Sequence, residues 1–141
     1  MFKSILLPVD VHHESSWKHT VPMAVKLAEI GGATLHVLAI VPDFGSSMVA
    51  TYFPPDFEKN ALAKAKTDIQ EFVAKHVPAT ITSKIHVGHG KIYHEIIRFA
   101  DSQGADLIIM GSRHKDHGFL IGSNAERVSR HAKQNILIVR D

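Results

Sequence analysis

Five short β-like runs alternate with segments of helical periodicity, and this alternation restricts the possible folds more than any other feature of the chain. The runs are Ser4–Val9, Ala33–Val41, Ala79–Val87, Asp106–Met110 and Asn135–Val139. The first, fourth and fifth are almost continuously aliphatic, which is typical of strands in a parallel sheet covered on both faces. Short connections between strand and helix favour right-handed crossovers. We therefore expect an α/β fold with a single doubly wound five-stranded parallel sheet flanked by helices.

Apolar residues recur at helical spacing in the four segments between these runs. The stripes span 21–28, 62–73, 92–100 and 125–132. Gly31 and Gly32 follow the first stripe and predict its end, whereas Asp56 is a predicted N-cap of the second. The last helix is preceded by Ser-Asn-Ala-Glu at 123–126, the pattern of a capping box.

Size and composition narrow the class of protein. The 141 residues predict one domain, 1–141. The absence of cysteine excludes disulfides, thiolate-held iron–sulfur clusters and a cysteine nucleophile. Apolar runs fall far short of the roughly 20 residues that span a bilayer, and no secretory h-region follows Met1. A net charge of +2 gives no indication of nucleic-acid binding. We expect a cytoplasmic protein with neither membrane insertion nor a nucleic-acid partner.

The residues that follow the strands are the first place to look for chemistry, because ligands of open α/β sheets bind at the carboxyl ends of the strands. The segment from Gly111 to Ser123 joins the fourth run to a helix start. Its glycines allow close backbone approach, Arg113 and Lys115 carry positive charge, and the helix start offers free N–H donors. This segment predicts a phosphate cradle, with an ordinary flexible loop as the alternative.

Asp10 directly follows the first run, Ile5-Leu6-Leu7-Pro8-Val9. A carboxylate at that position can accept hydrogen bonds from both hydroxyls of a ribose. Helix capping and metal binding, the latter together with His12 and His13, are the alternatives for this residue.

These features lie in an order that resembles the universal stress protein family, and specifically its nucleotide-binding branch. The resemblance covers the whole chain. It is carried by Ile5-Leu6-Leu7-Pro8-Val9-Asp10, by Ala33-Thr34-Leu35-His36-Val37, by Asp106 to Arg113, and by Gly122 to Val128 with His131-Ala132 and Ile136 to Arg140. The last of these is the most specific.

The resemblance implies a Rossmann-like fold of the adenine nucleotide alpha hydrolase type, with an adenine nucleotide across the strand ends. It implies that Asp10 holds the ribose and that Pro8, Val9, Val37 and Met110 flank the adenine. The phosphates would lie against Gly111, Arg113, His114, Gly122, Ser123 and Asn124. ATP is the nucleotide that the family suggests, with Mg²⁺ carried in by its phosphates.

The phosphate loop departs from the family pattern G-x2-G-x9-G-[ST]. His114 replaces the middle glycine, and seven residues separate it from Gly122. A shorter loop leaves open whether ATP, ADP or AMP is preferred.

Other motifs give weaker indications. His86-Val87-Gly88-His89 matches the H-x-G-H pattern of nucleotidylyl transferases, but at the end of the third run instead of the first. We interpret it as a chance match. The G-x-G-x-x-G, P-loop and G-x-S-x-G patterns are missing.

We therefore expect a nucleotide-binding stress or regulatory protein with no catalytic residue and no resident metal. The family suggests a homodimer through the final strand. We also expect a regulatory protein partner, which the sequence does not identify. The segment from Pro42 to Pro55 is expected to be a lid or an interface. A slow ATPase or phosphotransferase, and a nucleotide-free interaction module, are the alternatives.

Histidines are concentrated at the predicted ligand edge. Of the 11 in the chain, five are expected there: His12, His13, His89, His114 and His117. Histidine gains its charge near pH 6.5, so nucleotide affinity is expected to rise between roughly pH 7.5 and 6.

Overall fold

The computed structural model describes residues 1–42, 56–112 and 121–140. The expectations for the connection after Pro42 and for Arg113, His114 and His117 concern residues outside these ranges.

The described strands form one parallel five-stranded sheet, which confirms the predicted fold class. They are β1 (Ser4–Pro8), β2 (Thr34–Pro42), β3 (Ser83–Gly90), β4 (Leu107–Gly111) and β5 (Asn135–Val139). Their order in space is β3-β2-β1-β4-β5, and every neighbouring pair is parallel. The chain moves outward from β1 to β3, then returns to place β4 on the other side of β1. The winding therefore reverses between β1 and β4, where α/β sheets form a ligand crevice.

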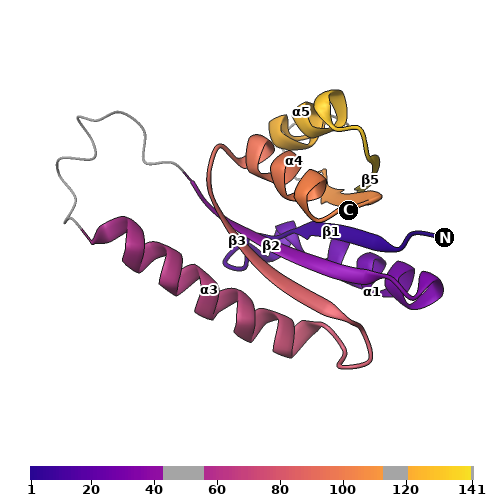
Figure 1. Ribbon diagram of the computed structural model, residues 1–141, viewed down its shortest axis with the longest axis horizontal. Coiled ribbons are helices and arrows are strands. Elements are labelled where there is room, and N and C mark those ends of the chain that lie inside the picture. Colours follow the sequence, from indigo (N-terminus) through magenta and orange to yellow (C-terminus); the bar gives the residue numbers. More distant parts are fainter. Residues whose placement is uncertain (43–55, 113–120, 141) are drawn as a thin grey trace.

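Helices cover both faces of the sheet (Figure 1). One face carries α1 (Thr20–Gly31) and α3 (Phe57–His76), and the other carries α4 (Ile92–Ser102) and α5 (Ser123–His131). A short 3₁₀ turn, η1 (Glu14–Ser16), connects β1 to α1.

Successive side chains of β1 point to opposite faces of the sheet and so belong to two separate core layers. Ile5 and Leu7 point into the layer under α1 and α3, whereas Leu6 points into the layer under α4 and α5. All three side chains are fully buried. Burying a side chain of this size contributes roughly 1.5–3 kcal/mol, so the central strand is anchored from both sides.

The third strand begins and ends later than expected. The prediction was Ala79–Val87, whereas β3 runs from Ser83 to Gly90. Pro78 accepts a hydrogen bond from the amide of Ile81, so this part of the segment is a turn. At the other end, Gly88, His89 and Gly90 pair with Ile40, Val41 and Pro42 because β2 extends that far.

The helix starts also differ in detail from the sequence expectation. Gly122, and not Ser123, is the N-cap of α5, and no side chain caps this end. The predicted capping box is therefore wrong: the Glu126 carboxylate pairs with Arg130 instead. Asp56 does occupy the N-cap of α3, but its side chain makes no capping hydrogen bond.

Within the described ranges, no helix combines the length and the apolar character that crossing a bilayer requires.

Candidate functional site

A cleft of about 690 Å³ lies at the carboxyl ends of β1, β2 and β4. Its volume is in the range of small-molecule sites. The lining comes from the β1 end and the turn after it (Pro8 to His12 and Ser16), the β2 end (Leu38 to Pro42), α3 (Ala61, Lys64, Ala65 and Asp68), α4 (Ile92 and Ile96), the β4 end (Met110 and Gly111) and the start of α5 (Gly122 to Ala125).

The middle of this lining is apolar. Leu38 and Ile40 come from β2, and Ile92, Ile96 and Met110 come from the layer below α4 and α5. Two small residues of α3, Ala61 and Ala65, complete the opposite wall. A flat apolar group can be desolvated here at little cost, because few polar atoms lose water with it.

Asp10 lies at one polar end of the cleft on a backbone that is held locally. Its amide donates to Ser16 Oγ at 3.0 Å, and Ser16 Oγ donates back to the Asp10 carbonyl at 2.9 Å. The amide of His13 donates to the same carbonyl. These bonds fix the turn after β1, so the position of the carboxylate follows from the fold.

The Asp10 carboxylate itself remains open to solvent, with 44% of the side chain exposed. Its Oδ2 lies 2.8 Å from His13 Nδ1, and its Oδ1 accepts a longer bond from the amide of His12. A carboxylate has about four acceptor sites. Asp10 therefore retains acceptor capacity toward the cleft.

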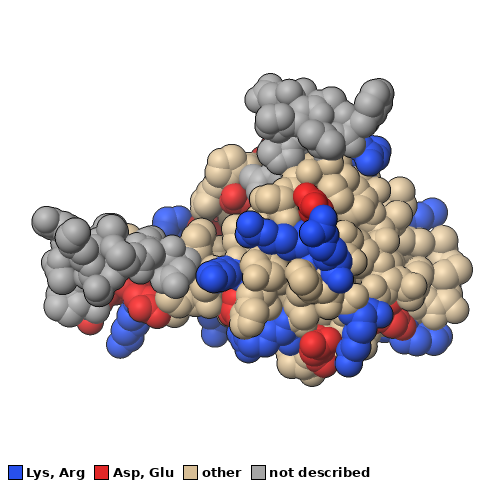
Figure 2. Space-filling model, turned by 90° about the horizontal axis from the view of Figure 1, so that it is seen from above, with Lys and Arg blue, Asp and Glu red and all other residues tan. Residues whose placement is uncertain are grey.

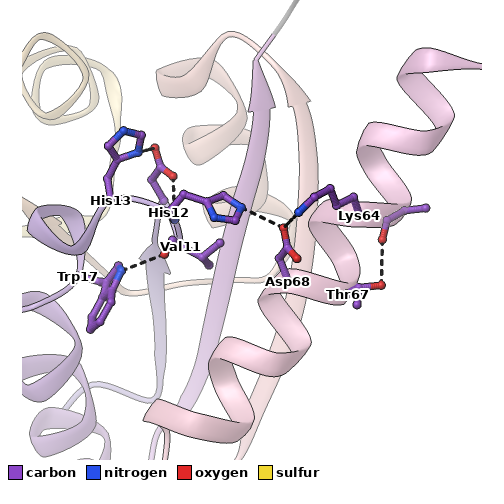
Figure 3. A network of polar contacts seen from close by, with 9 residues as sticks. Val11, His12, His13, Trp17, Lys64, Thr67 and Asp68 are labelled. Atoms are coloured by element: carbon purple, nitrogen blue, oxygen red, sulfur yellow. Dashed lines mark hydrogen bonds and ion pairs between the residues drawn. The ribbon is translucent and has the colours of Figure 1, made fainter.

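His12 connects the turn after β1 to α3 (Figure 3). His12 Nε2 lies 3.0 Å from Asp68 Oδ2, and Lys64 Nζ donates to the same oxygen at 2.7 Å. The hydrogen bond from Lys64, together with the bond from His12, lowers the pKa of Asp68. Asp68 is therefore an anion at neutral pH that holds two donors at the rim of the cleft.

The first turn of α5 forms the other polar end. The first intrahelical bond runs from the amide of Glu126 to the carbonyl of Gly122. The amides of Ser123, Asn124 and Ala125 precede it and have no acceptor within the helix. All three residues line the cleft. A helix start of this kind attracts anions through its N–H groups and its dipole.

Most of the predicted site residues within the described ranges lie in this cleft. They are Pro8, Val9, Asp10, Met110, Gly111, Gly122, Ser123 and Asn124. Val37 is the exception. It lies in the middle of β2, fully buried in the layer under α1 and α3. The resemblance placed Val37 beside the adenine, but β2 continues to Pro42, so Val37 lies well before the end of the strand.

The sequence reasoning missed several lining residues. Ile40 is one, and the extent of the apolar run could have indicated it, since a run reaching Val41 ends near Ile40. Lys64 and Asp68 are also among them. Their only signal in the sequence is the i, i+4 spacing, which is typical of a surface ion pair. Their place in the cleft depends on how α3 lies across the sheet.

The H-x-G-H motif is explained by packing. His86 points to the α4 side, where its Nε2 lies 2.8 Å from His36 Nδ1 and its ring lies beside Phe99. His89 instead lies next to Glu58 of α3, on the opposite face. The two imidazoles therefore do not converge on one phosphate, as strand alternation predicts.

Gly88 of the same motif leaves room for α4. A Cβ at Gly88 would lie 3.0 Å from Phe99 Cε2 and 3.1 Å from Glu95 Oε1. Glu95 is buried and accepts hydrogen bonds from Arg98 and from the His89 amide, which lower its pKa.

Replacing Gly88 with valine is expected to destabilise the fold by about 1–3 kcal/mol, because the branched side chain overpacks this contact. Urea unfolding of the variant measures the loss. Ala63→Val, a change of similar size on the exposed side of α3, serves as the comparison. Equal stability of the two variants would contradict the packing explanation.

The metal alternative for Asp10, His12 and His13 finds no geometric support. His13 turns to Asp10, while His12 turns away to Asp68. Among the described residues, no group of three or more His, Asp or Glu side chains is arranged to hold a metal ion.

Comparison with known proteins adds to this picture. The model of the universal stress protein family matches residues 1–140. Universal stress protein G of Shigella flexneri is 33% identical over 145 aligned residues, covering 99% of this chain and 100% of the relative.

Solved structures agree at the level of the fold. A universal stress protein in complex with cAMP superposes with a TM-score of 0.63 at 22% identity, covering 99% of this chain and 97% of the other. The universal stress protein of Archaeoglobus fulgidus in complex with dAMP has a TM-score of 0.60 at 18% identity, with 96% of each chain covered.

Proposed function

This chain belongs to the universal stress protein family, and from that premise we propose that it binds an adenine nucleotide in the cleft at the strand ends. The nucleotide would act as the ligand of a regulatory or stress-response switch. The family alone does not specify the ligand, so the proposal depends on the geometry of the cleft.

One observation carries the proposal: an exposed carboxylate and a helix start lie on the same apolar cleft. Asp10 offers acceptors for ribose hydroxyls, and the amides of Ser123 and Asn124 offer donors for phosphate. The apolar lining from Leu38, Ile40 and Met110 suits a purine. A nucleotide has one part for each of these three features: a base, a ribose and a phosphate.

Two solved relatives support the choice of adenine. One was solved with cAMP and the other with dAMP, both adenine nucleotides with a single phosphate. We propose ATP, ADP or AMP as the ligand of this chain, with Mg²⁺ entering on the phosphates of ATP. Arg113 and His114 would add contacts to the phosphates.

We propose a binding role and not efficient catalysis. Of the ionisable groups described in the cleft, His12 and Lys64 contact Asp68, and Asp10 contacts the neighbouring His13. Bound nucleotide would change the surface around the cleft and so its affinity for a regulatory protein partner. A homodimer through the free edge of β5 and a cytoplasmic location complete the proposal.

Native mass spectrometry of the freshly purified full chain tests ligand and assembly together. We expect a dimer that carries one adenine nucleotide per chain, or that takes one up when ATP, ADP or AMP is added. A chain that takes up none of the three would identify a nucleotide-free module. Sustained ADP release, lost in Asp10→Ala, would instead identify a slow ATPase.

A further inference from the structure

A second, smaller groove lies between α4 and α5. Its volume is about 350 Å³, and its lining consists of Tyr93, Ser123, Glu126, Arg127, Arg130 and His131. Among the described residues, Ser123 alone lines both this groove and the cleft. Seen from above, the face that carries α4 and α5 shows Lys and Arg side chains gathered across its middle (Figure 2).

The groove is rich in hydrogen-bond donors for which the described residues provide no acceptor. The Arg127 guanidinium lies over the Tyr93 ring, with its carbon 5.3 Å from the ring centroid. Within residues 1–42, 56–112 and 121–140, the guanidinium of Arg127 has no hydrogen bond or ion pair. Within the same ranges, the Tyr93 hydroxyl and the Ser123 hydroxyl have no hydrogen-bond partner. Arginine alone provides five N–H donors in a planar fork.

The single carboxylate in the lining is already paired. Glu126 Oε1 accepts a hydrogen bond from Arg130 Nη2 at 2.9 Å, which leaves other Arg130 donors available. Two guanidinium groups against one carboxylate make the groove net positive. A groove with spare donors and positive charge selects an anion.

Helix electrostatics explain only part of this arrangement. Arg130 and His131 lie in the last turn of α5, where cations stabilise a helix without any ligand. Arg127 is the fifth of the nine residues of α5, one turn earlier, and it is held against an aromatic ring of another helix. Its placement over Tyr93 orients the guanidinium into the groove lining.

We propose that this groove binds a phosphate monoester, at a site that shares Ser123 with the nucleotide cleft and is otherwise built from different residues. The dianion offers three terminal oxygens, which match the forked donors of Arg127 and Arg130 and the hydroxyls of Tyr93 and Ser123. The phosphate could belong to a phosphoserine in a protein partner or to a small phosphate ester. The proposal stands independently of nucleotide binding.

Fluorescence anisotropy of the full chain with a labelled phosphoserine peptide tests the site, and the same peptide with unmodified serine is the ligand control. We expect saturable binding of the phosphopeptide only, weakened about tenfold by Arg127→Gln through loss of a charge-assisted contact. Lys133→Gln removes one exposed positive charge just beyond the same helix and is expected to leave binding unchanged. Calorimetry with glycerol phosphate measures the small-ester arm directly.

The outcomes distinguish a protein partner from a small phosphate ester, and they distinguish the groove from the nucleotide cleft. Glycerol phosphate binding as tightly as the phosphopeptide assigns small esters, and tighter peptide binding assigns a protein partner. Arg127→Gln should leave nucleotide affinity intact, whereas Asp10→Ala should leave phosphopeptide affinity intact. The proposal is overturned if neither phosphate ligand binds saturably, if the unmodified peptide binds equally well, or if Arg127→Gln and Lys133→Gln weaken binding to the same extent.

Discussion

Replacing Asp10 with alanine is expected to weaken adenine-nucleotide binding by roughly 10- to 100-fold. The carboxylate lies at the end of β1 with acceptor capacity toward the cleft. Hydrogen bonds to a charged group contribute about 1.5–3 kcal/mol, and the variant would lose those made to the ribose hydroxyls. Isothermal titration calorimetry of both proteins with ATP, ADP and AMP measures the change.

Two further variants make this comparison specific. Asp10→Asn keeps the shape of the side chain and removes its charge, so its affinity should fall between those of the wild type and Asp10→Ala. Glu71→Ala removes an exposed carboxylate of α3 that is not part of the cleft lining. Its affinity should equal that of the wild type. An equal loss in Glu71→Ala would indicate a general charge effect and would contradict a specific role of Asp10.

Acid is expected to destabilise the protein through the pair of histidines between β2 and β3. His36 is buried, with 4% of its surface exposed, and its ring stacks on His86 at a centroid distance of 5.1 Å. Burial, with further contributions from His86 and Lys84, lowers the pKa of His36 to about 4. Burial also lowers the pKa of His86.

The sign of the effect follows from these pKa values. A histidine whose pKa is lower in the folded state binds its proton more readily when the chain is unfolded. Its contribution to stability is therefore fully present above pH 6.5 and declines as the pH falls toward 4. For His36 alone, the expected loss between pH 6.5 and 4.5 is roughly 2 kcal/mol.

Urea unfolding at several values between pH 6.5 and 4.5 measures this loss. The double variant His36→Leu, His86→Leu removes both imidazoles, and replacing both partners of a buried hydrogen bond by apolar groups avoids an unsatisfied polar atom. Its stability should fall less steeply with acid than that of the wild type. His19→Gln, a change at an exposed histidine, should keep the wild-type slope. If all three proteins shared one slope, the histidine pair would not be the cause.

The sequence predicted the parts of the fold and site that depend on local pattern. Asp10 was identifiable because it follows an aliphatic run directly, and the end of a buried strand is a ligand edge whatever the neighbours are. The same holds for Gly122 and Ser123, which lie at the start of a short amphipathic helix. These residues lie together because the parallel sheet brings the carboxyl ends of β1 and β4 to one edge.

Other features depend on tertiary contacts that local pattern does not encode. The extent of β3 is set by β2, which provides pairing partners as far as Pro42. The roles of Lys64 and Asp68 depend on the placement of α3 across the sheet.

Tertiary contacts also affect the expectation that histidines gather at the ligand edge. Of the three expected histidines that the structure describes, His12 lines the cleft, whereas His13 and His89 do not. His12 and His13 are each next to a carboxylate, Asp68 and Asp10 respectively. The rise of nucleotide affinity between roughly pH 7.5 and 6 stays a prediction, and calorimetry across that range tests it.

The most direct test of the proposed function is to map where an adenine nucleotide binds. Titrating the ¹⁵N-labelled chain with ATP, and separately with AMP, is expected to produce saturable amide shifts in three groups: Asp10 to Ser16, Leu38 to Val41, and Gly122 to Ala125. Asp10→Ala should reduce these shifts at equal ligand concentration. Shifts that do not saturate, or saturable shifts confined to residues outside the cleft, would contradict a nucleotide site at the strand ends.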